Sequence, residues 1–187
     1  MKNESIAVFG HGRAELRDAN GKLKELREFD NVFTDAGDAH VADQMASTPG
    51  EAAMSHMAIG TSAVTLTAGD TVLGGELDRN ALTSFTQGAG ADDNKVVYLG
   101  DWAAADGTGA ITEAGIFNTG TADTGSMLCA QTFSVINKGA SDTLAITLTQ
   151  CLGSLYRKIV SQLRELGGSL RNETIPNQAE AYCLGRA

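Results

Sequence analysis

The pattern of apolar and polar residues in the second half of the chain predicts a series of β-strands. Five segments after residue 78 combine alternation of apolar and polar side chains, or a short apolar run, with many β-branched residues. They are separated by breaks rich in Gly, Asp, Asn, Ser and Thr. These segments are 79–87, 95–102, 112–118, 126–136 and 143–150. Short strands at this spacing are typical of an antiparallel β-sandwich of the jelly-roll type, which is therefore the fold class that we expect.

The segment 112–118 is expected to be the central strand, because both of its faces carry apolar side chains. Gly115 interrupts one face, and a glycine inside a strand often marks the close approach of another group. Gly115 thus leaves a notch, a place on the face without a side chain, and Glu113 lies beside this notch on the same face. A carboxylate in such a place requires a cation or several amide donors, so Glu113 needs a partner from elsewhere in the fold.

A charged hairpin is predicted near the N-terminus. Segments 12–17 and 22–32 flank the turn sequence Asp-Ala-Asn-Gly at 18–21. Both segments carry several charges, which favours an exposed edge that resists unwanted pairing.

One short helix is predicted in the first half of the chain. Thr34 is a suitable N-cap for a helix over about 35–47, which the Pro-Gly pair at 49–50 would end. The apolar stripe of this helix is expected to contain Val41, Ala42, Met45 and Ala46. A short buried strand is expected at 54–59.

The sequence changes in character after Gln150, which divides the chain into a predicted β-sandwich domain at 1–150 and an arm at 151–187. Ser154 can cap an amphipathic helix that a glycine pair at 167–168 would end. The apolar stripe of the arm, and its expected docking surface, consists of Leu155, Tyr156, Ile159, Val160, Leu163 and Leu166. A helix of this length is marginal alone, so we expect the arm to pack on its own sandwich or on a sister subunit.

Charge restricts the partners of the protein. The net charge is −9, which argues against nucleic acid and anionic membranes, because both repel an acidic surface. Residues 1–150 hold nine basic and twenty acidic side chains, a balance of −11, whereas 151–187 hold five basic and three acidic ones, a balance of +2. A weakly basic arm can therefore dock on an acidic body, either its own or a neighbour's.

The cysteines and the N-terminus predict synthesis in a reducing cytoplasm. Cys129, Cys151 and Cys183 lack the spacing of metal ligands, and the N-terminus lacks the apolar core of a signal peptide. No apolar run approaches membrane-spanning length. Free thiols are therefore expected, and a Cys151–Cys183 disulfide formed after release into an oxidising medium is the alternative.

The sequence lacks the common catalytic motifs. The histidines are isolated, there is no phosphate-binding loop or nucleophile elbow, and the acidic loops match no calcium-binding pattern. We therefore expect no catalytic residues, no metal and no cofactor. Instead, we expect a partly buried ion pair between Arg79 and Glu113 that fixes the order of the strands.

Two other interpretations of these residues concern carbohydrates. Glu76 and Glu113 could be the paired carboxylates of a glycosidase, although the aromatic subsites of such enzymes are missing. Trp102, the only tryptophan, could stack on a sugar, although core packing at a strand end explains it more simply.

Six stretches, arranged in order over residues 12–149, carry a family resemblance. They are 57–61 (MAIGT), 69–79 (GDTVLGGELDR), 100–102 (GDW), 107–118 (GTGAITEAGIFN), 133–138 (FSVINK) and 142–144 (DTL). In order and spacing they resemble a family of small tailed-bacteriophage virion proteins, described as tail-fibre, collar or other structural components. The resemblance implies a virion protein without known catalytic residues. The segment 151–187 extends beyond the point where members of the family tend to stop.

These features together predict a noncatalytic virion structural protein, most simply an oligomeric capsid-surface decoration (cement) protein. The alternatives are a tail-fibre or collar component and an adhesin that binds a host surface glycan. A fibre would show a repetitive or coiled-coil shaft, and the sequence has neither. The expected partners are further copies of the chain, in a cyclic homo-oligomer such as a trimer, and the major capsid or tail proteins of the same virion. The expected location is the virion, after assembly in the host cytoplasm.

Overall fold

The structure, a computed structural model, describes residues 6–154 of the 187-residue chain. The elements of this part are β1 Ile6–Arg17, β2 Leu23–Phe33, α1 Asp35–Gln44, β3 His56–Gly60, β4 Glu76–Ala81, β5 Ser84–Gln87, η1 Gly90–Asp92, β6 Lys95–Trp102, β7 Gly109–Phe117, β8 Met127–Lys138 and β9 Thr143–Ser154. The prediction of a mainly β protein with a short helix in its N-terminal half is confirmed. The first four residues of the predicted arm, 151–154, are the end of β9. The rest of the arm, with the whole of its predicted docking stripe, lies outside the described residues.

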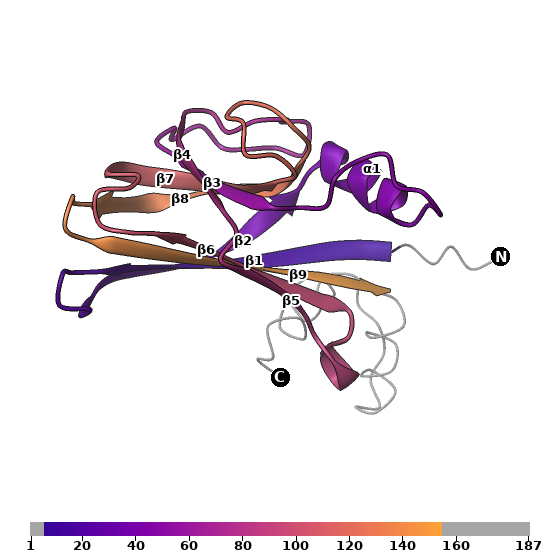
Figure 1. Ribbon diagram of the computed structural model, residues 1–187, viewed down its shortest axis with the longest axis horizontal. Coiled ribbons are helices and arrows are strands. Elements are labelled where there is room, and N and C mark those ends of the chain that lie inside the picture. The colour runs from indigo at the N-terminus through magenta and orange to yellow at the C-terminus, as the bar shows by residue number, and fades with distance from the viewer. Residues whose placement is uncertain (1–5, 155–187) are drawn as a thin grey trace, which may run out of the picture.

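The strands form one nine-stranded antiparallel sheet in the order β4-β3-β7-β8-β2-β1-β9-β6-β5. β2 connects its two halves, because it pairs with β1 over most of its length but with β8 only at Val32 and Phe33. Figure 1 shows β3, β4, β7 and β8 facing β1, β9, β6 and β5, with β2 passing from one half to the other. The sheet therefore curls as a half-barrel, and the two separate sheets of the expected sandwich are not clearly formed.

The hydrophobic core lies between the facing halves of the curled sheet. Its largest fully buried side chains are Trp102, Leu16, Met57, Ile59, Ile111, Ile116, Ile136, Leu144, Ile146 and Leu148. Alternate residues of β9 contribute three of them, as the alternation of its sequence requires. Phe117 and Met127 are also fully buried, but they belong to a second, smaller cluster. α1 packs against β8 at one end of the half-barrel.

The N-terminal hairpin is an inner part of the sheet, so the expectation of an exposed edge is wrong. β9 pairs with the whole of β1, and the edges of the sheet are β4 and β5. The charges of β1 lie on the face opposite the buried Ala14 and Leu16, where Glu15 pairs with both Arg13 and Arg17. Because Glu15 offsets part of the charge of the two arginines, the charged face does not prevent pairing on both sides of the strand.

The boundaries of several elements differ from their predicted positions. The segment predicted as one strand at 79–87 consists of β4 and β5, and β9 continues to Ser154. β7 is an inner strand between β3 and β8, although β2 occupies the middle of the strand order. α1 ends at Gln44, and Met45, predicted on its apolar stripe, is the C-cap residue and 81% exposed.

Candidate functional site

The fully buried carboxylate of Glu113 on β7 is bound by three backbone amides. Its Oε1 accepts hydrogen bonds from Ser62 N (3.1 Å) and Gly75 N (2.8 Å), and its Oε2 accepts one from Gly74 N (2.9 Å). Gly60 on β3 faces Glu113, and a Cβ atom at Gly60 would collide with Oε1. The carboxylate therefore holds the loop between β3 and β4 against the sheet.

The glycine notch next to Glu113 is filled by the same loop. A Cβ atom at Gly115 would lie 3.2 Å from Leu73 Cδ2 and 3.1 Å from the carbonyl oxygen of Cys129. The predicted close approach of another group at Gly115 is thus confirmed, and that group is the side chain of Leu73, which is buried in a small cluster with Phe117.

Arg79 on β4 forms a buried ion pair with Glu76 and reaches the loop between β7 and β8. The guanidinium donates from Nε to Glu76 Oε1 (2.8 Å) and from Nη2 to Oε2 (2.7 Å). Its Nη1 donates to the carbonyl oxygens of Thr119 (3.0 Å) and Thr124 (3.1 Å). The cation also lies over the ring of Phe117, 3.8 Å from its centroid. One side chain therefore links an edge strand, an inner strand and a loop.

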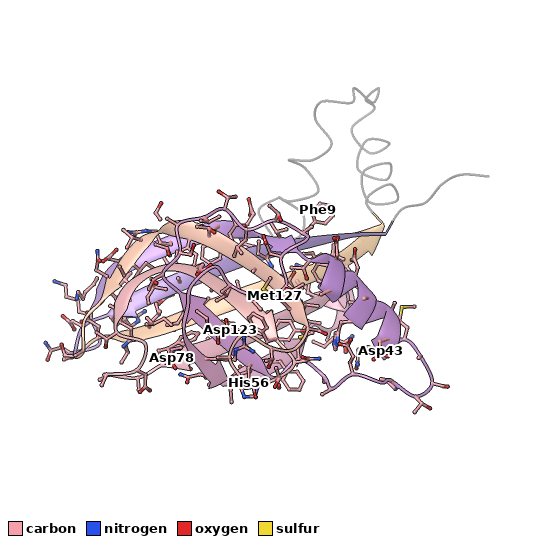
Figure 2. All side chains as sticks on the ribbon, turned by 90° about the horizontal axis from the view of Figure 1, so that it is seen from above. Phe9, Asp43, His56, Asp78, Asp123 and Met127 are labelled. Carbon is pink, nitrogen blue, oxygen red and sulfur yellow. The ribbon has the colours of Figure 1, made fainter. Side chains whose placement is uncertain are left out.

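The predicted ion pair between Arg79 and Glu113 is wrong, because each of these residues has another partner. A register shift leaves Leu77 as an extra residue on β4 and sets Glu76 opposite Gly60, so Glu76 can meet the guanidinium. The loop amides satisfy Glu113. The sequence indicated that the Glu113 carboxylate requires either a cation or several amide donors. In the structure, amide donors bind it. This region lies on the side of the molecule marked by Asp78 and His56 in Figure 2.

The carbohydrate interpretations find little support in this geometry. The oxygens of Glu76 and Glu113 are engaged by Arg79 and by backbone amides, respectively. Trp102 is 1% exposed and belongs to the core, as the simpler interpretation predicted. Within residues 6–154, no group of three or more His, Cys, Asp or Glu side chains could hold a metal ion.

A cavity of about 600 Å³ opens beside α1 and is the second candidate site. Its lining is mainly apolar and comes from β2, α1, β5, β6, β8, β9 and the residues before β3. Met45 and Phe85 belong to this lining and are 81% and 67% exposed, so they mark its mouth. Figure 1 shows α1 at the end of the half-barrel where β9 terminates. The cavity is therefore an apolar hollow with two large hydrophobic side chains in solvent.

A hydrogen-bond cluster orients His40, which lines the cavity from α1. Its Nδ1 is 3.0 Å from Glu51 Oε2, which also accepts a hydrogen bond from the hydroxyl of Ser126 (2.6 Å). The Ser126 hydroxyl, and after it His40, hold the pKa of Glu51 below its ordinary value. The cluster joins α1 to β8 and fixes one wall of the cavity.

The opposite wall contributes polar groups that are not fully satisfied. Gln150 on β9 is buried, and its Nε2 donates to Cys129 Sγ (3.2 Å), whereas its Oε1 has no hydrogen-bond partner within the described part of the chain. Tyr98 on β6 also lines the cavity, and burial raises the pKa of its hydroxyl to about 12. The cavity thus combines apolar walls with a few polar atoms, the usual composition of a recognition site.

The sequence contains little that would have revealed this cavity. Its lining comes from segments between Phe33 and Leu152, and the curl of the sheet brings them together. The one local signal is the pair of large apolar residues, Met45 and Phe85, in otherwise polar surroundings.

The predicted docking stripe, from Leu155 to Leu166, and Cys183 lie outside the described residues, so the predictions about them stay predictions. Cys151 is disulfide-bonded, so the expectation that its thiol is free is wrong. Cys129 is a free, buried thiol, and burial raises its pKa to about 12. No helix in residues 6–154 is both long enough and apolar enough to cross a membrane.

Comparison of this chain with protein-family models, with curated proteins and with solved structures gave no match.

Proposed function

We propose that this chain is a noncatalytic virion structural protein of a tailed bacteriophage, an oligomeric subunit that decorates the capsid surface. The sequence resemblance over residues 12–149 supports the virion assignment. One structural observation supports association: the apolar cavity has Met45 and Phe85 exposed at its mouth. Apolar surface of this kind is stabilised when another molecule removes it from water.

The arrangement of the buried charges is consistent with a structural role. Glu113 fastens one long loop to the sheet, and the Glu76–Arg79 pair fastens another. Groups used in this way make a rigid subunit, which suits repeated assembly. The facing halves of the curled sheet also support the finer proposal that the fold is related to jelly-roll sandwiches.

The proposed mechanism is the addition of many weak contacts by symmetry. Each copy buries apolar surface against its neighbours in a cyclic homo-oligomer, for which we propose a trimer, and the oligomer binds the major capsid protein. The acidic net charge of −9 disfavours nucleic acid and membranes as partners.

The second candidate is a tail-fibre or collar component of the same kind of virion. The family resemblance supports it equally, and the absence of a shaft-like repeat in the sequence places it second. An adhesin that binds host glycan is a weaker proposal, because Trp102, the residue on which it rested, is buried in the core.

The location on the particle tests the proposal directly. Antibodies against the purified chain, applied to intact particles of the phage that encodes it and viewed by electron microscopy, are expected to label the head. Labelling of the tail would select the second candidate, and unlabelled particles that contain no such chain by mass spectrometry would overturn both. Light scattering of the purified chain gives the oligomeric state separately.

A further inference from the structure

The cavity beside α1 needs an apolar occupant, and the chain continues close to it. Leu152 on β9 lines the cavity, and the described chain ends two residues later, at Ser154. The next residue, Leu155, begins the apolar stripe that the sequence predicts for the arm. We propose that residues 155–166 of a second copy occupy this cavity. This inference rests on the proposed function, since it requires that copies associate.

The pairing of β9 favours a neighbour's arm over the chain's own. β9 stays paired with β1 up to Ser154, which lies opposite Ile6, so the strand holds its direction to its last residue. Connections between elements usually take two to six residues, and here Leu155 follows Ser154 directly. Within one chain, Leu155 and Tyr156 are therefore too close to Ser154 to turn back past Leu152, and only the later residues of the stripe could reach the cavity. The arm of another copy can present the whole stripe.

The chemistry of the two surfaces is complementary. The stripe offers aliphatic side chains and one hydroxyl, that of Tyr156. The cavity offers apolar walls, together with the unpartnered Oε1 of Gln150 and the ring of His40. Residues 151–187 carry a net charge of +2, and residues 1–150 carry a net charge of −11. The approach of an arm to a neighbouring body is therefore electrostatically favourable.

Exchange of arms also explains how a closed assembly can form. The donor surface and the acceptor surface are different parts of the chain, so each contact is heterologous. A heterologous contact closes into a ring when the rotation between copies permits, and every copy then gives one arm and receives another. Each cavity in the ring is filled without any further protein.

The first test uses charge substitutions in the full-length chain. Met45→Glu combined with Phe85→Glu places charge at the mouth of the cavity, and Leu163→Glu places it on the stripe. The control is Val64→Glu, an equally drastic change at an apolar residue that is 71% exposed and does not line the cavity. All of the substituted residues in the described part are exposed, so these variants are expected to fold, which circular dichroism will verify.

The expected result is measured by light scattering over a dilution series. The mouth variant and Leu163→Glu should each raise the concentration at which the oligomer dissociates by at least about tenfold, as losses at the centre of an interface do. Val64→Glu should leave it unchanged. If the oligomer persists equally in all three variants, the docking proposal is overturned while oligomerisation stands. A wild-type chain that is monomeric at every concentration overturns both proposals.

The second test identifies the donor copy. The photo-crosslinking residue p-benzoylphenylalanine replaces Phe85 in chains labelled with heavy nitrogen, which are refolded together with unlabelled wild-type chains. The proposal predicts cross-links from heavy position 85 to light peptides within 155–166 after irradiation. Cross-links to heavy peptides alone would show that each arm fills its own cavity, and cross-links outside 155–166 would show another occupant. Either result overturns the proposal.

Discussion

Replacing Glu113 with Gln tests whether a buried carboxylate bound by amides secures the loop between β3 and β4. The side chain keeps its size, so packing is preserved. Its negative charge disappears, and one of its two oxygens becomes an NH₂ group. That group cannot accept a hydrogen bond, although both positions of the carboxylate accept bonds from backbone N–H donors in the wild type.

The magnitude follows from the three hydrogen bonds. In its best orientation the Gln carbonyl keeps the amides of Ser62 and Gly75, and the NH₂ group then faces the N–H of Gly74. A hydrogen bond to a charged group contributes about 1 kcal/mol more than a neutral one, and an unsatisfied buried donor costs about 1–3 kcal/mol. Removal of a buried charge offsets part of this loss. The free energy of unfolding should therefore fall by about 3 kcal/mol.

Urea unfolding followed by circular dichroism measures this loss. At a typical denaturant slope of about 1–3 kcal/mol per M, the midpoint should shift downward by about 1–3 M. The control is Glu25→Gln, which removes a partly exposed ion pair with Arg27 and should change the free energy of unfolding by less than about 1 kcal/mol. A Glu113→Gln variant as stable as this control would refute the reasoning.

The other predictions concern the remaining buried and paired groups. Arg79→Ala should lower the free energy of unfolding by about 3–5 kcal/mol, because it leaves the buried carboxylate of Glu76 without its cation; urea unfolding measures the loss, and a change below about 1 kcal/mol contradicts it. The thiol of Cys129, with its pKa raised to about 12, should resist maleimide at pH 8 in the folded protein and react in urea; rapid labelling of the peptide that contains Cys129 in the folded protein, detected by mass spectrometry, would count against its burial. The bond from Ser126 lowers the pKa of Glu51, so the stabilisation by Glu51 is present above the ordinary glutamate value of 4.5 and is lost as pH falls through the lowered pKa. Between pH 5 and pH 3 the urea midpoint of Glu51→Gln should therefore fall less than that of the wild type, and parallel profiles would exclude this role.

The elements of the fold could be predicted because they depend on local pattern. The alternation in β9, the cap at Thr34 and the turn before β2 are local features, and each appears close to its predicted position. The order of the strands is not local. Charges on β1 indicated an edge, but Glu15 pairs with both arginines along the outer face, and β9 covers the other side of the strand. The curl of the sheet depends on how β2 divides its pairing, which no sequence period encodes.

The candidate site shows the same division between local and distant information. The sequence showed that Gly115 is a notch and that Glu113 requires partners, because both conclusions concern one strand. It did not show which partners, since the amides of Gly74 and Gly75 reach Glu113 only through the path of a long loop. The choice of Arg79 followed the assumption that a buried charge is met by an opposite charge. Backbone amides can serve equally, and glycines let the backbone approach closely enough to do so.

The two candidate sites therefore have opposite character, and this difference bears on function. At the Glu113 site every strong interaction is satisfied within the chain, so the site can hold loops in place but has no free oxygen on the carboxylate to offer a ligand. At the cavity, Met45 and Phe85 remain exposed and Gln150 keeps an unpartnered oxygen within the described residues. A partner gains binding free energy by covering apolar side chains that are exposed in the isolated molecule, or by pairing with polar atoms that lack a hydrogen bond there. If copies of this chain assemble, the cavity is the place where association would gain most, and the cluster of His40, Glu51 and Ser126 is what fixes one of its walls.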